Sequence, residues 1–417
     1  MSRFLGYRCS LCQREYLESQ VQYTCPKDGG NLDVALDVDH IRKFVSPGQI
    51  FAQAEPSIWR YLPLLPVDDP GFEGTPLHRV GWTPTFETPR LAEELGLKTL
   101  WVKDESRNPT ASFKDRASAV VVTRAREIKA EVVVTASTGN AGAALAGMAA
   151  AIGQKAVIFA PRTAPPAKVA QLLVFGAQVI LVDGNYDSAF DLTIQAAREF
   201  GWYCRNTGYN PFTAEGKKTA AFEIWEWWEK TRRQHPQFSR LNVFVSVGDG
   251  NIISGLHKGF KDLLALGWIE QMPRIFGVQS TGSAAIYNAF QAGTEQITPV
   301  IANTLADSIS VDLPRDGVRA VRAARETGGR YLAVEDEKIL EAIASLGKVG
   351  IFAEPAGATS YAGLVQAVQA GWIGEEDAVV VLNTGSGLKD IKAAMQAVPQ
   401  APVIEPTLSA LTKHLYG

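Results

Sequence analysis

The chain of 417 residues lacks the marks of several protein classes. It contains no apolar run that approaches the length of a membrane-spanning helix. Its net charge is −3, and no long cluster of basic residues offers a surface for nucleic acid or anionic lipid. The N-terminal sequence M-S-R-F-L-G-Y-R-C has neither an apolar signal core nor a transit-peptide composition. We therefore expect a cytoplasmic protein that binds neither nucleic acid nor a membrane.

Cysteine is scarce, because four residues in so long a chain cannot form a disulfide framework. Three of the four lie near the N-terminus, where Cys9-x-x-Cys12 is followed by Cys25-Pro-Lys-Asp28. This array resembles a zinc ribbon or knuckle in which Asp28 replaces the fourth thiolate, with the distant Cys204 as an alternative fourth ligand. The same residues would also fit a relic knuckle held by hydrogen bonds without metal. We predict a structural zinc site at Cys9, Cys12, Cys25 and Asp28.

Internal repeats and low-complexity tracts are also absent, and the composition is that of a globular protein, with 46% apolar and 20% charged residues. A chain of this length exceeds the size of one hydrophobic core, so we expect two domains and an extension. Short β-branched runs alternate with Ala-rich helical stretches; they lie near residues 100, 134, 158, 181, 245, 277 and 380. Such runs are typical of parallel strands covered on both faces. The sequence therefore predicts an α/β fold with two open, doubly wound sheets.

One lysine stands in a setting that chemistry could use. The segment 108–117 reads N-P-T-A-S-F-K-D-R-A, so that Lys114 follows a turn signal and Phe113 and begins a predicted helix. An amine that is partly removed from water has a lowered pKa and can attack a carbonyl group. A surface lysine at an ordinary helix N-terminus would give the same local pattern.

Three further loops follow predicted strands, where ligands gather in open α/β sheets. After V-V-V-T-A come Ser137, Thr138, Gly139 and Asn140, which offer hydroxyl, amide and backbone donors to an anion such as a carboxylate. A capped helix without a ligand is the alternative. After A-V-V-V-L comes N-T-G-S-G-L-K-D, in which Thr384 places a hydroxyl at the same kind of edge.

The third loop, Gly248-Asp249-Gly250-Asn251, follows V-F-V-S-V and opens a helix, an arrangement suited to phosphate. It is not the dinucleotide-binding fingerprint, because Ile253 stands where a third glycine is needed. A P-loop lysine is also missing. The charge of Asp249 would repel phosphate unless its side chain points away. A plain strand-to-helix turn is the alternative.

Taken together, N-P-T-A-S-F-K-D-R, S-T-G-N-A-G, V-G-D-G-N and N-T-G-S-G-L-K-D resemble, in order and spacing, the loops of pyridoxal-phosphate enzymes of the tryptophan synthase β family, fold type II. Within it the chain is most similar to the threonine synthases, over about residues 50–395. The resemblance implies a zinc-ribbon-like knuckle (1–35), a large cofactor-binding domain (36–120 and 240–417) and a small domain (121–239).

The resemblance also implies roles for the residues that meet the cofactor. Lys114 forms the Schiff base with pyridoxal phosphate and later moves protons as general base and acid. Asn140 hydrogen-bonds the phenolic oxygen of the cofactor, and Thr384 meets the pyridine nitrogen through its hydroxyl. The cofactor phosphate is held by backbone N–H groups of Gly248, Asp249, Gly250 and Asn251. A neutral partner for the pyridine nitrogen favours elimination and replacement chemistry.

On the substrate side, the resemblance assigns Ser137 and Thr138 to the carboxylate and Ser112 to the substrate. Polar groups near the lysine that could assist a substrate phosphate are Lys103, Thr110 and Arg116 together with Ser112. Glu354 could lie near the cofactor ring, but its position as the first residue of E-P-A-G-A-T-S favours a helix cap.

The implied reaction converts O-phospho-L-homoserine and water to L-threonine and phosphate in a homodimer. Ala111 stands where the family usually has glycine, and V-G-D-G-N departs from its more typical phosphate loop, so other substrates stay open. The alternatives are cysteate synthase, which would take O-phospho-L-serine and sulfite, and other pyridoxal-phosphate enzymes of β-elimination or replacement. A non-catalytic interaction protein of the same fold is a different class of alternative.

Overall fold

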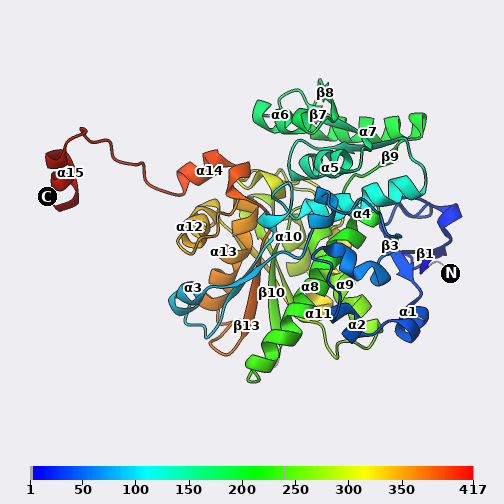
Figure 1. Cartoon of the computed structure of the whole chain (residues 1–417), viewed down its shortest axis with the longest axis horizontal. Helices are drawn as coiled ribbons and strands as arrows, with labels where there is room; N and C mark the ends of the chain where they lie inside the picture. The colour runs from blue at the N-terminus through cyan, green and yellow to red at the C-terminus, as the bar shows by residue number, and fades with distance from the viewer. Residues whose placement is uncertain (1–2, 239, 417) are drawn as a thin grey trace.

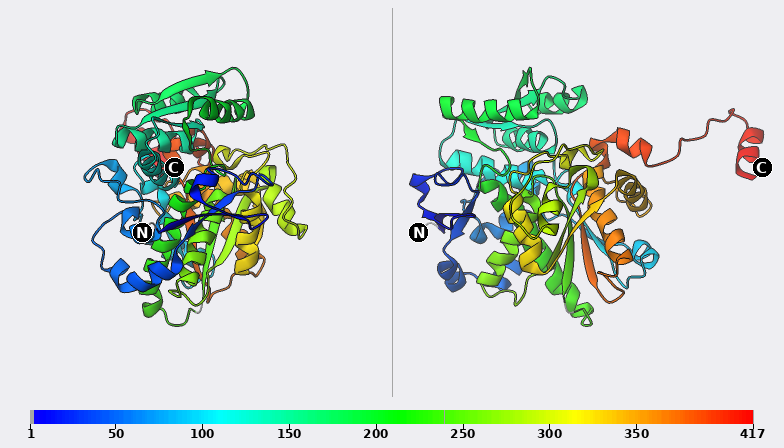
Figure 2. Two further views of the ribbon diagram at one scale, coloured as in Figure 1. Left: turned by 90° about the vertical axis from the view of Figure 1, so that its right-hand side faces the viewer. Right: turned by 180° about the vertical axis from the view of Figure 1, so that it is seen from behind.

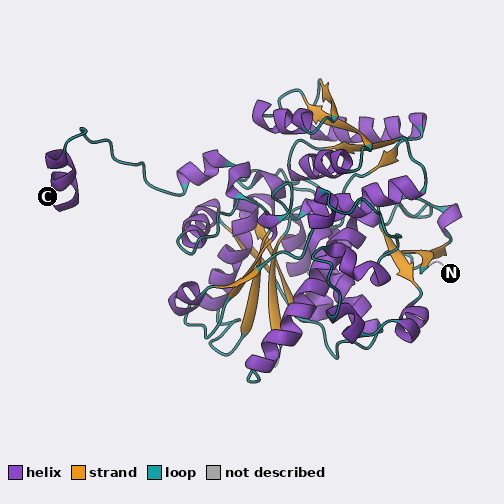
Figure 3. Cartoon of the chain, in the orientation of Figure 1, coloured by secondary structure: helices purple, strands orange, loops and turns teal. Residues whose placement is uncertain are grey.

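The computed structural model describes residues 3–238 and 240–416, which form a layered α/β body with a C-terminal arm that extends away from it (Figures 1 and 3). Three sheets, of six, four and three strands, organise the body. Within the described ranges, no helix combines the length and apolarity needed to cross a membrane.

The six-stranded sheet is parallel except at one edge. Its spatial order is β12 (Tyr331–Val334), β11 (Arg274–Ser280), β10 (Leu241–Ser246), β13 (Ala378–Asn383), β5 (Trp101–Asp104) and β4 (Thr85–Glu87), with β4 antiparallel to β5. Successive residues of β10 face opposite cores, because Val243 and Phe244 belong to different apolar clusters. The first core involves α8 (Phe212–Gln234), α9 (Asn251–Ala265), α10 (Ala285–Gln291) and α11 (Gly317–Thr327). The second involves α3 (Pro89–Glu94), α12 (Asp336–Gly347) and α13 (Pro355–Gln369).

The four-stranded sheet is wholly parallel and lies at the top of Figure 1. Its order is β8 (Gln178–Val182), β7 (Lys155–Pro161), β6 (Val132–Ala136) and β9 (Tyr203–Cys204). One face packs with α4 (Lys114–Glu127), α5 (Asn140–Ala151) and α6 (Pro166–Val174), and the other with α7 (Tyr186–Phe200). Helix α5 is built almost entirely from Ala and Gly, so it can approach the sheet closely.

The N-terminal knuckle is an antiparallel sheet of β1 (Phe4–Cys9), β2 (Glu15–Tyr16) and β3 (Leu32–Leu36), which includes the turn η1 (Glu18–Gln20). It is followed by α1 (Val38–Phe44), α2 (Pro47–Phe51) and the 3₁₀ segment η2 (Ile58–Leu64), which is kinked at Tyr61 and contains Pro63. The remaining 3₁₀ turns are η3 (Pro76–Arg79), η4 (Glu105–Arg107), η5 (Thr281–Ser283), η6 (Asp307–Ile309) and η7 (Gly387–Lys389).

After α14 (Ile391–Gln396) the chain leaves the body, and α15 (Leu408–Tyr416) stands apart from it in Figure 1 and in the right-hand view of Figure 2. None of the residues of α15 is buried. This terminal helix therefore lies outside the core.

The predicted fold class is confirmed: two doubly wound parallel sheets and a cysteine-bearing N-terminal extension are present. All seven predicted strands exist, while the short strands β4, β9 and β12 had no sequence prediction. The domain boundaries 1–35, 36–120 with 240–417, and 121–239 stay a prediction. Helix α8, which this division places in the small domain, packs mainly on α9 and α4.

Candidate active site

Lys114 is the first residue of α4, where the chain passes from a tight loop into the helix. The loop turns at Ala111, which has a φ of +63° in the left-handed region that disfavours residues with a Cβ atom. Its N–H donates to the Asn108 carbonyl at 2.8 Å. Ser112 lies beneath the lysine, and its Oγ accepts the Lys114 backbone N–H at 3.4 Å.

The lysine loop is joined to the loop that follows β13. The Phe113 N–H donates to the Thr384 carbonyl at 2.9 Å, and the Ser386 N–H donates to the Ala111 carbonyl at 3.1 Å. Ser112 and Gly385 form an antiparallel bridge between the two segments. These bonds place the buried Thr384 beside the lysine loop, as the site prediction requires.

The Lys114 amine is held in an environment that favours its neutral form. Burial lowers its pKa, and the Arg205 charge acts in the same direction, while the Glu354 and Asp249 carboxyls oppose both. Within the described part of the chain, the amine makes no hydrogen bond or ion pair. Such an amine can act as a nucleophile and as a base near neutral pH.

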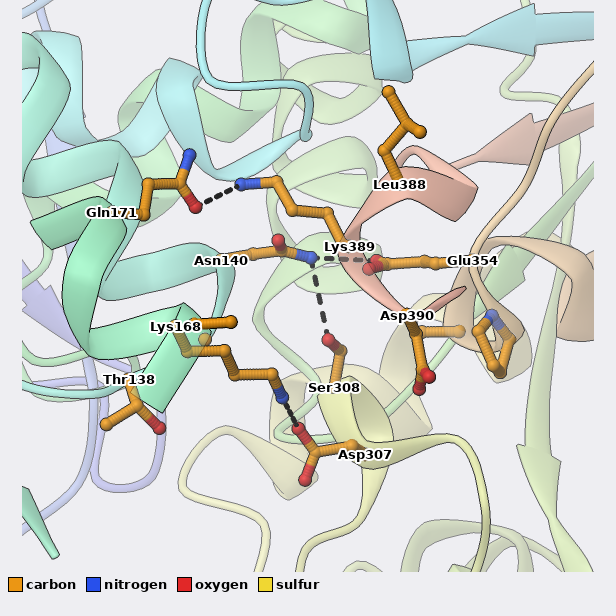
Figure 4. Close-up of a pocket in the computed structure, with 14 residues that line it drawn as sticks. Thr138, Asn140, Lys168, Gln171, Asp307, Ser308, Glu354, Leu388, Lys389 and Asp390 are labelled. Carbon is orange, nitrogen blue, oxygen red and sulfur yellow. Dashed lines mark hydrogen bonds and ion pairs between the residues drawn. The ribbon is translucent and has the colours of Figure 1, made fainter. Parts of the chain in front are cut away.

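Asn140, the first residue of α5, points across the cleft toward α13 (Figure 4). Its Nδ2 donates to Glu354 Oε1 at 2.7 Å and to Ser308 Oγ at 3.5 Å. Burial raises the pKa of Glu354, and the Asn140 hydrogen bond acts against that effect. The expectation that Glu354 caps a helix is wrong for its side chain, because the carboxyl makes no cap hydrogen bond and faces Asn140 instead.

Thr138 and Gly139 line the same pocket as Asn140, and Ser137 precedes them at the end of β6. All three are half-buried. The pocket is spanned by two contacts to α6, a Lys168–Asp307 ion pair and a bond from Lys389 Nζ to Gln171 Oε1 at 3.1 Å (Figure 4). The Ser137–Asn140 loop is therefore accessible to a small ligand from the cleft.

The loop 248–251 connects β10 to α9. Gly250 has a φ of +89°, and a Cβ atom there would lie 2.7 Å from the Asp316 carbonyl oxygen, so this position needs glycine. A Cβ on Gly248 would lie 2.8 Å from Ile309 Cα. The backbone N–H groups in the first turn of a helix have no partner within the helix and can bind an anion. The geometry is that of an anion cradle.

The two polar side chains of this loop are turned to protein partners. Asp249 Oδ1 accepts the Arg315 N–H at 3.3 Å, and burial raises the Asp249 pKa, so its charge is reduced. Asn251 donates to Asp316 Oδ2 at 2.7 Å and accepts from Lys217 Nζ at 2.5 Å. The loop therefore offers an anion its backbone rather than these side chains.

Sequence reasoning missed three buried polar residues. Burial lowers the pKa of Lys217, and repulsion from Lys114 and Arg205 adds to the effect. Burial likewise lowers the pKa of Arg205 to about 10. Arg205 Nη2 and Asn206 Nδ2 are buried without a hydrogen-bond partner. Within the described residues the site thus holds two unused buried donors, which a bound anion would satisfy.

Lys103 and Arg116 are not available to a substrate. Arg116 is fully buried and donates to Glu105 Oε2 at 2.7 Å and to Glu223 Oε1 at 2.5 Å. Lys103 Nζ donates to Glu223 Oε2 at 2.7 Å. Thr110 is bonded to both carboxylate oxygens of Asp115. The expectation that these three assist a substrate phosphate is wrong, because their partners are all internal.

Cys9, Cys12, Cys25 and Asp28 come together in the N-terminal knuckle, and their ligand atoms all lie within 4.8 Å of one another. Cys204 is on β9, inside the core of the four-stranded sheet, and is not part of this group. The structure thus brings together the four residues predicted to bind a metal and separates them from the alternative fourth ligand.

Comparison with known proteins gives both sequence and fold relatives. Residues 77–385 match the family model described as pyridoxal-phosphate dependent enzyme. A threonine synthase from Methanocaldococcus jannaschii is 39% identical over 98% of each chain. One from Methanosarcina acetivorans is 36% identical, again over 98% of each chain. Among solved structures, diaminopropionate ammonia lyase from Escherichia coli in complex with D-serine superposes with a TM-score of 0.67 at 21% identity, covering 85% of this chain and 93% of that one.

Proposed function

The chain belongs to the pyridoxal-phosphate-dependent enzyme family, and we propose that it acts as a threonine synthase, converting O-phospho-L-homoserine and water to L-threonine and phosphate. The whole-length similarity to two threonine synthases supports this substrate over those of other family members. The observation that carries the proposal within the site is the pair of buried donors Arg205 Nη2 and Asn206 Nδ2, which have no hydrogen-bond partner within the described residues.

The residues of the site fit pyridoxal phosphate. Gly250 adopts a left-handed conformation at the start of α9, where a Cβ atom would lie 2.7 Å from the Asp316 carbonyl oxygen, so the tight turn that brings this backbone to the cleft needs glycine. Lys114 supplies an amine with a lowered pKa for the cofactor aldehyde. In this proposal the phosphate lies on the backbone of Gly248–Asn251, and Asn140 and Thr384 contact the ring. When bound, the cofactor withdraws electrons from the substrate and so acidifies its α C–H bond.

Two buried donors outside the loop assigned to the cofactor phosphate indicate a site for a second phosphate group. Arg205 Nη2 and Asn206 Nδ2 lie after β9 of the four-stranded sheet, and neither has a hydrogen-bond partner within residues 3–238 and 240–416. A buried guanidinium without a carboxylate is costly unless a ligand anion compensates it. We assign these donors to the phosphate of the substrate, which in O-phosphohomoserine is the leaving group. Ser137 and Thr138 hold the substrate carboxylate in this arrangement, and Ser112 lies beside the reacting lysine.

Lys114 is the residue that moves protons. Once the substrate has displaced it, its free amine takes the α proton and then one β proton. The bond from the γ carbon to the phosphate oxygen breaks, and the γ carbon becomes a methyl group when it receives a proton. Water adds its hydroxyl to the β carbon, and the α proton is returned. Burial lowers the pKa of the amine and so makes its neutral, proton-accepting form easier to reach.

The product assay tests the assignment. Purified enzyme with pyridoxal phosphate is given O-phosphohomoserine, and threonine and phosphate are measured in equal amounts. Lys114→Ala is expected to lose both by at least about 1000-fold, because it removes the nucleophile and the base together. A second arm supplies O-phosphoserine and sulfite. Threonine absent from the first arm, or cysteate from the second at a higher kcat/KM, would overturn the proposal.

Three coarser properties follow from the same assignment. We infer a homodimer, as the family resemblance implies, and light scattering of the purified enzyme measures it. A cytoplasmic location agrees with four cysteines that form no disulfide among the described residues. The net charge of −3 and the small-molecule substrate agree with a protein that does not bind nucleic acid.

A further inference from the structure

The four ligand atoms of the N-terminal knuckle all lie within 4.8 Å of one another, and two of their separations are close to those of a tetrahedral zinc site. Cys12 Sγ and Cys25 Sγ are 3.7 Å apart, and Cys9 Sγ is 3.3 Å from Asp28 Oδ1. With zinc–sulfur bonds of about 2.3 Å and zinc–oxygen bonds of about 2.0 Å, a regular tetrahedron has edges of roughly 3.8 and 3.5 Å. Three thiolates and one carboxylate are a donor set that zinc accepts and that leaves no open position.

The surroundings of the cluster are built around these ligands. The Leu11 N–H donates to Cys9 Sγ at 3.3 Å, and the Gly30 N–H donates to Asp28 Oδ1 at 3.0 Å. Donors of this kind orient metal ligands and stabilise thiolates. Gly30 has no room for a side chain, since a Cβ atom would lie 2.8 Å from Cys9 Sγ.

The segment that leaves the cluster contacts the site. Asn31 follows Gly30 directly, and its Nδ2 donates to the Gly208 carbonyl and, at 3.0 Å, to the Arg315 carbonyl. Arg315 in turn donates its N–H to Asp249 Oδ1 at 3.3 Å, inside the loop assigned to the cofactor phosphate. One side chain of the knuckle thus holds the segment that braces this loop.

A second connection runs in parallel from β3. Arg319 Nη1 donates to Asp33 Oδ1 at 2.6 Å, and Arg319 Nε donates to Asp316 Oδ1 at 2.6 Å. The other oxygen of Asp316 accepts from Asn251 Nδ2 at 2.7 Å. Asp316 is fully buried and Arg319 nearly so, and their ion pair is therefore shielded from solvent, whereas Asp33 is partly exposed. Together these contacts join the knuckle to the start of α9.

We propose that one zinc ion, bound by Cys9, Cys12, Cys25 and Asp28, holds the knuckle in the conformation in which Asn31 and Asp33 brace the cofactor-phosphate loop. The metal is remote from the chemistry and strengthens cofactor binding through these contacts. The proposal rests on the assignment of loop 248–251 to the phosphate of pyridoxal phosphate. It does not depend on which amino acid is the substrate.

The test measures zinc and cofactor affinity separately. Wild-type protein purified without chelator should contain one zinc per chain. Cys12→Ser should lose the zinc and raise the dissociation constant of pyridoxal phosphate, followed by its visible absorbance, by about tenfold. Cys204→Ala, which changes the cysteine outside the cluster, should keep both the zinc and the affinity.

Asn31→Asp distinguishes the effect of zinc binding from the effect of the Asn31 hydrogen bonds to the Gly208 and Arg315 carbonyls. It is isosteric, but it points a carboxylate at two carbonyl oxygens, so it should keep the zinc and still weaken cofactor binding about tenfold. At saturating cofactor it should regain most of its kcat, which a general loss of folding would not allow.

Wild-type protein without stoichiometric zinc would overturn the metal site. Unchanged cofactor affinity in Asn31→Asp, or in Cys12→Ser that has lost its zinc, would overturn the coupling. If Cys12→Ser does not fold, Asn31→Asp and the zinc content of the wild type decide the question. If the enzyme does not make threonine, the zinc content and the cofactor affinity can still be measured. That result would therefore contradict only the assignment of O-phosphohomoserine as the substrate.

Discussion

The Glu354 carboxylate accepts a hydrogen bond of 2.7 Å from the Asn140 amide and thereby joins the start of α13 to the start of α5. The first helix packs on the six-stranded sheet and the second on the four-stranded sheet. The two residues are 214 positions apart in the chain. The contact therefore orients the amide that we assign to the cofactor from across the cleft.

Glu354→Ala tests this orienting role. We expect kcat to fall by at least about tenfold, because the Asn140 amide loses its partner at a cost of about 1 to 3 kcal/mol. Glu354→Gln retains an acceptor oxygen and should stay within about threefold of wild type by the same reasoning. Steady-state kinetics with saturating cofactor provide the measurement. Equal losses in the two variants would show that the carboxyl acts through its charge rather than as an acceptor.

Asn206→Asp tests the assignment of the substrate phosphate. Asn206 Oδ1 already accepts from Thr135 Oγ1 and the Ala136 N–H, and the variant keeps that oxygen. It replaces the unused amide donor with an acceptor that repels an anion. We expect KM for O-phosphohomoserine to rise by about 10- to 100-fold, as for a lost charged hydrogen bond. Inhibition by unphosphorylated L-homoserine serves as the control, and an equal loss of its binding would contradict the assignment.

Asp115 makes stability depend on pH. Burial raises its pKa from 3.8 to about 6, so between these values the folded protein binds a proton that the unfolded chain releases. Folding stability from this group is therefore complete at low pH and is lost as the pH rises through about 6. From pH 5 to 7.5 the loss is about 1 kcal/mol. Urea unfolding of the wild type and Asp115→Asn should show that difference closing in the variant, and parallel curves would refute it.

Ala111→Gly tests the strain in the lysine loop. Ala111 has a φ of +63°, which costs about 1 kcal/mol more for alanine than for glycine, partly offset by the greater flexibility of glycine in the unfolded chain. We expect stability to rise by up to about 1 kcal/mol. Lys129→Gly, at a φ of +57° just beyond the C-terminal end of α4, is a control for the backbone effect. A decrease in stability for Ala111→Gly alone would mean that the Cβ atom makes compensating contacts.

The sequence predicts the architecture well because parallel strands covered on both faces must be continuous apolar runs. All six residues of β10 and of β13 are buried. Strand β9 has only two residues, too few to give a periodic signal. The knuckle could be predicted because cysteine spacing is a local property.

The site is predicted where it consists of loops and missed where it depends on tertiary contacts. Lys114 and Thr384 could be predicted because turn residues and glycines lie beside them in the sequence. Lys217 lies inside the long helix α8, where a lysine predicts a solvated face, yet it is fully buried. Arg205 and Asn206 follow β9, the two-residue strand that is too short to be predicted from hydrophobic periodicity. The local sequence around Glu354 predicts a helix cap, whereas its actual hydrogen-bond partner, Asn140, comes from the distant helix α5.

Arg116 lies two positions after Lys114 and forms buried ion pairs with both Glu105 and Glu223. Burial acts to raise the pKa of Glu223, but the Arg116 and Lys103 charges outweigh burial and lower it to about 2. Replacing one would leave an uncompensated charge beneath the reacting lysine, at a cost of about 3 to 5 kcal/mol. In evolution these positions are thus expected to change jointly or to stay fixed, and their covariation would record the ion network rather than any preference for a substrate.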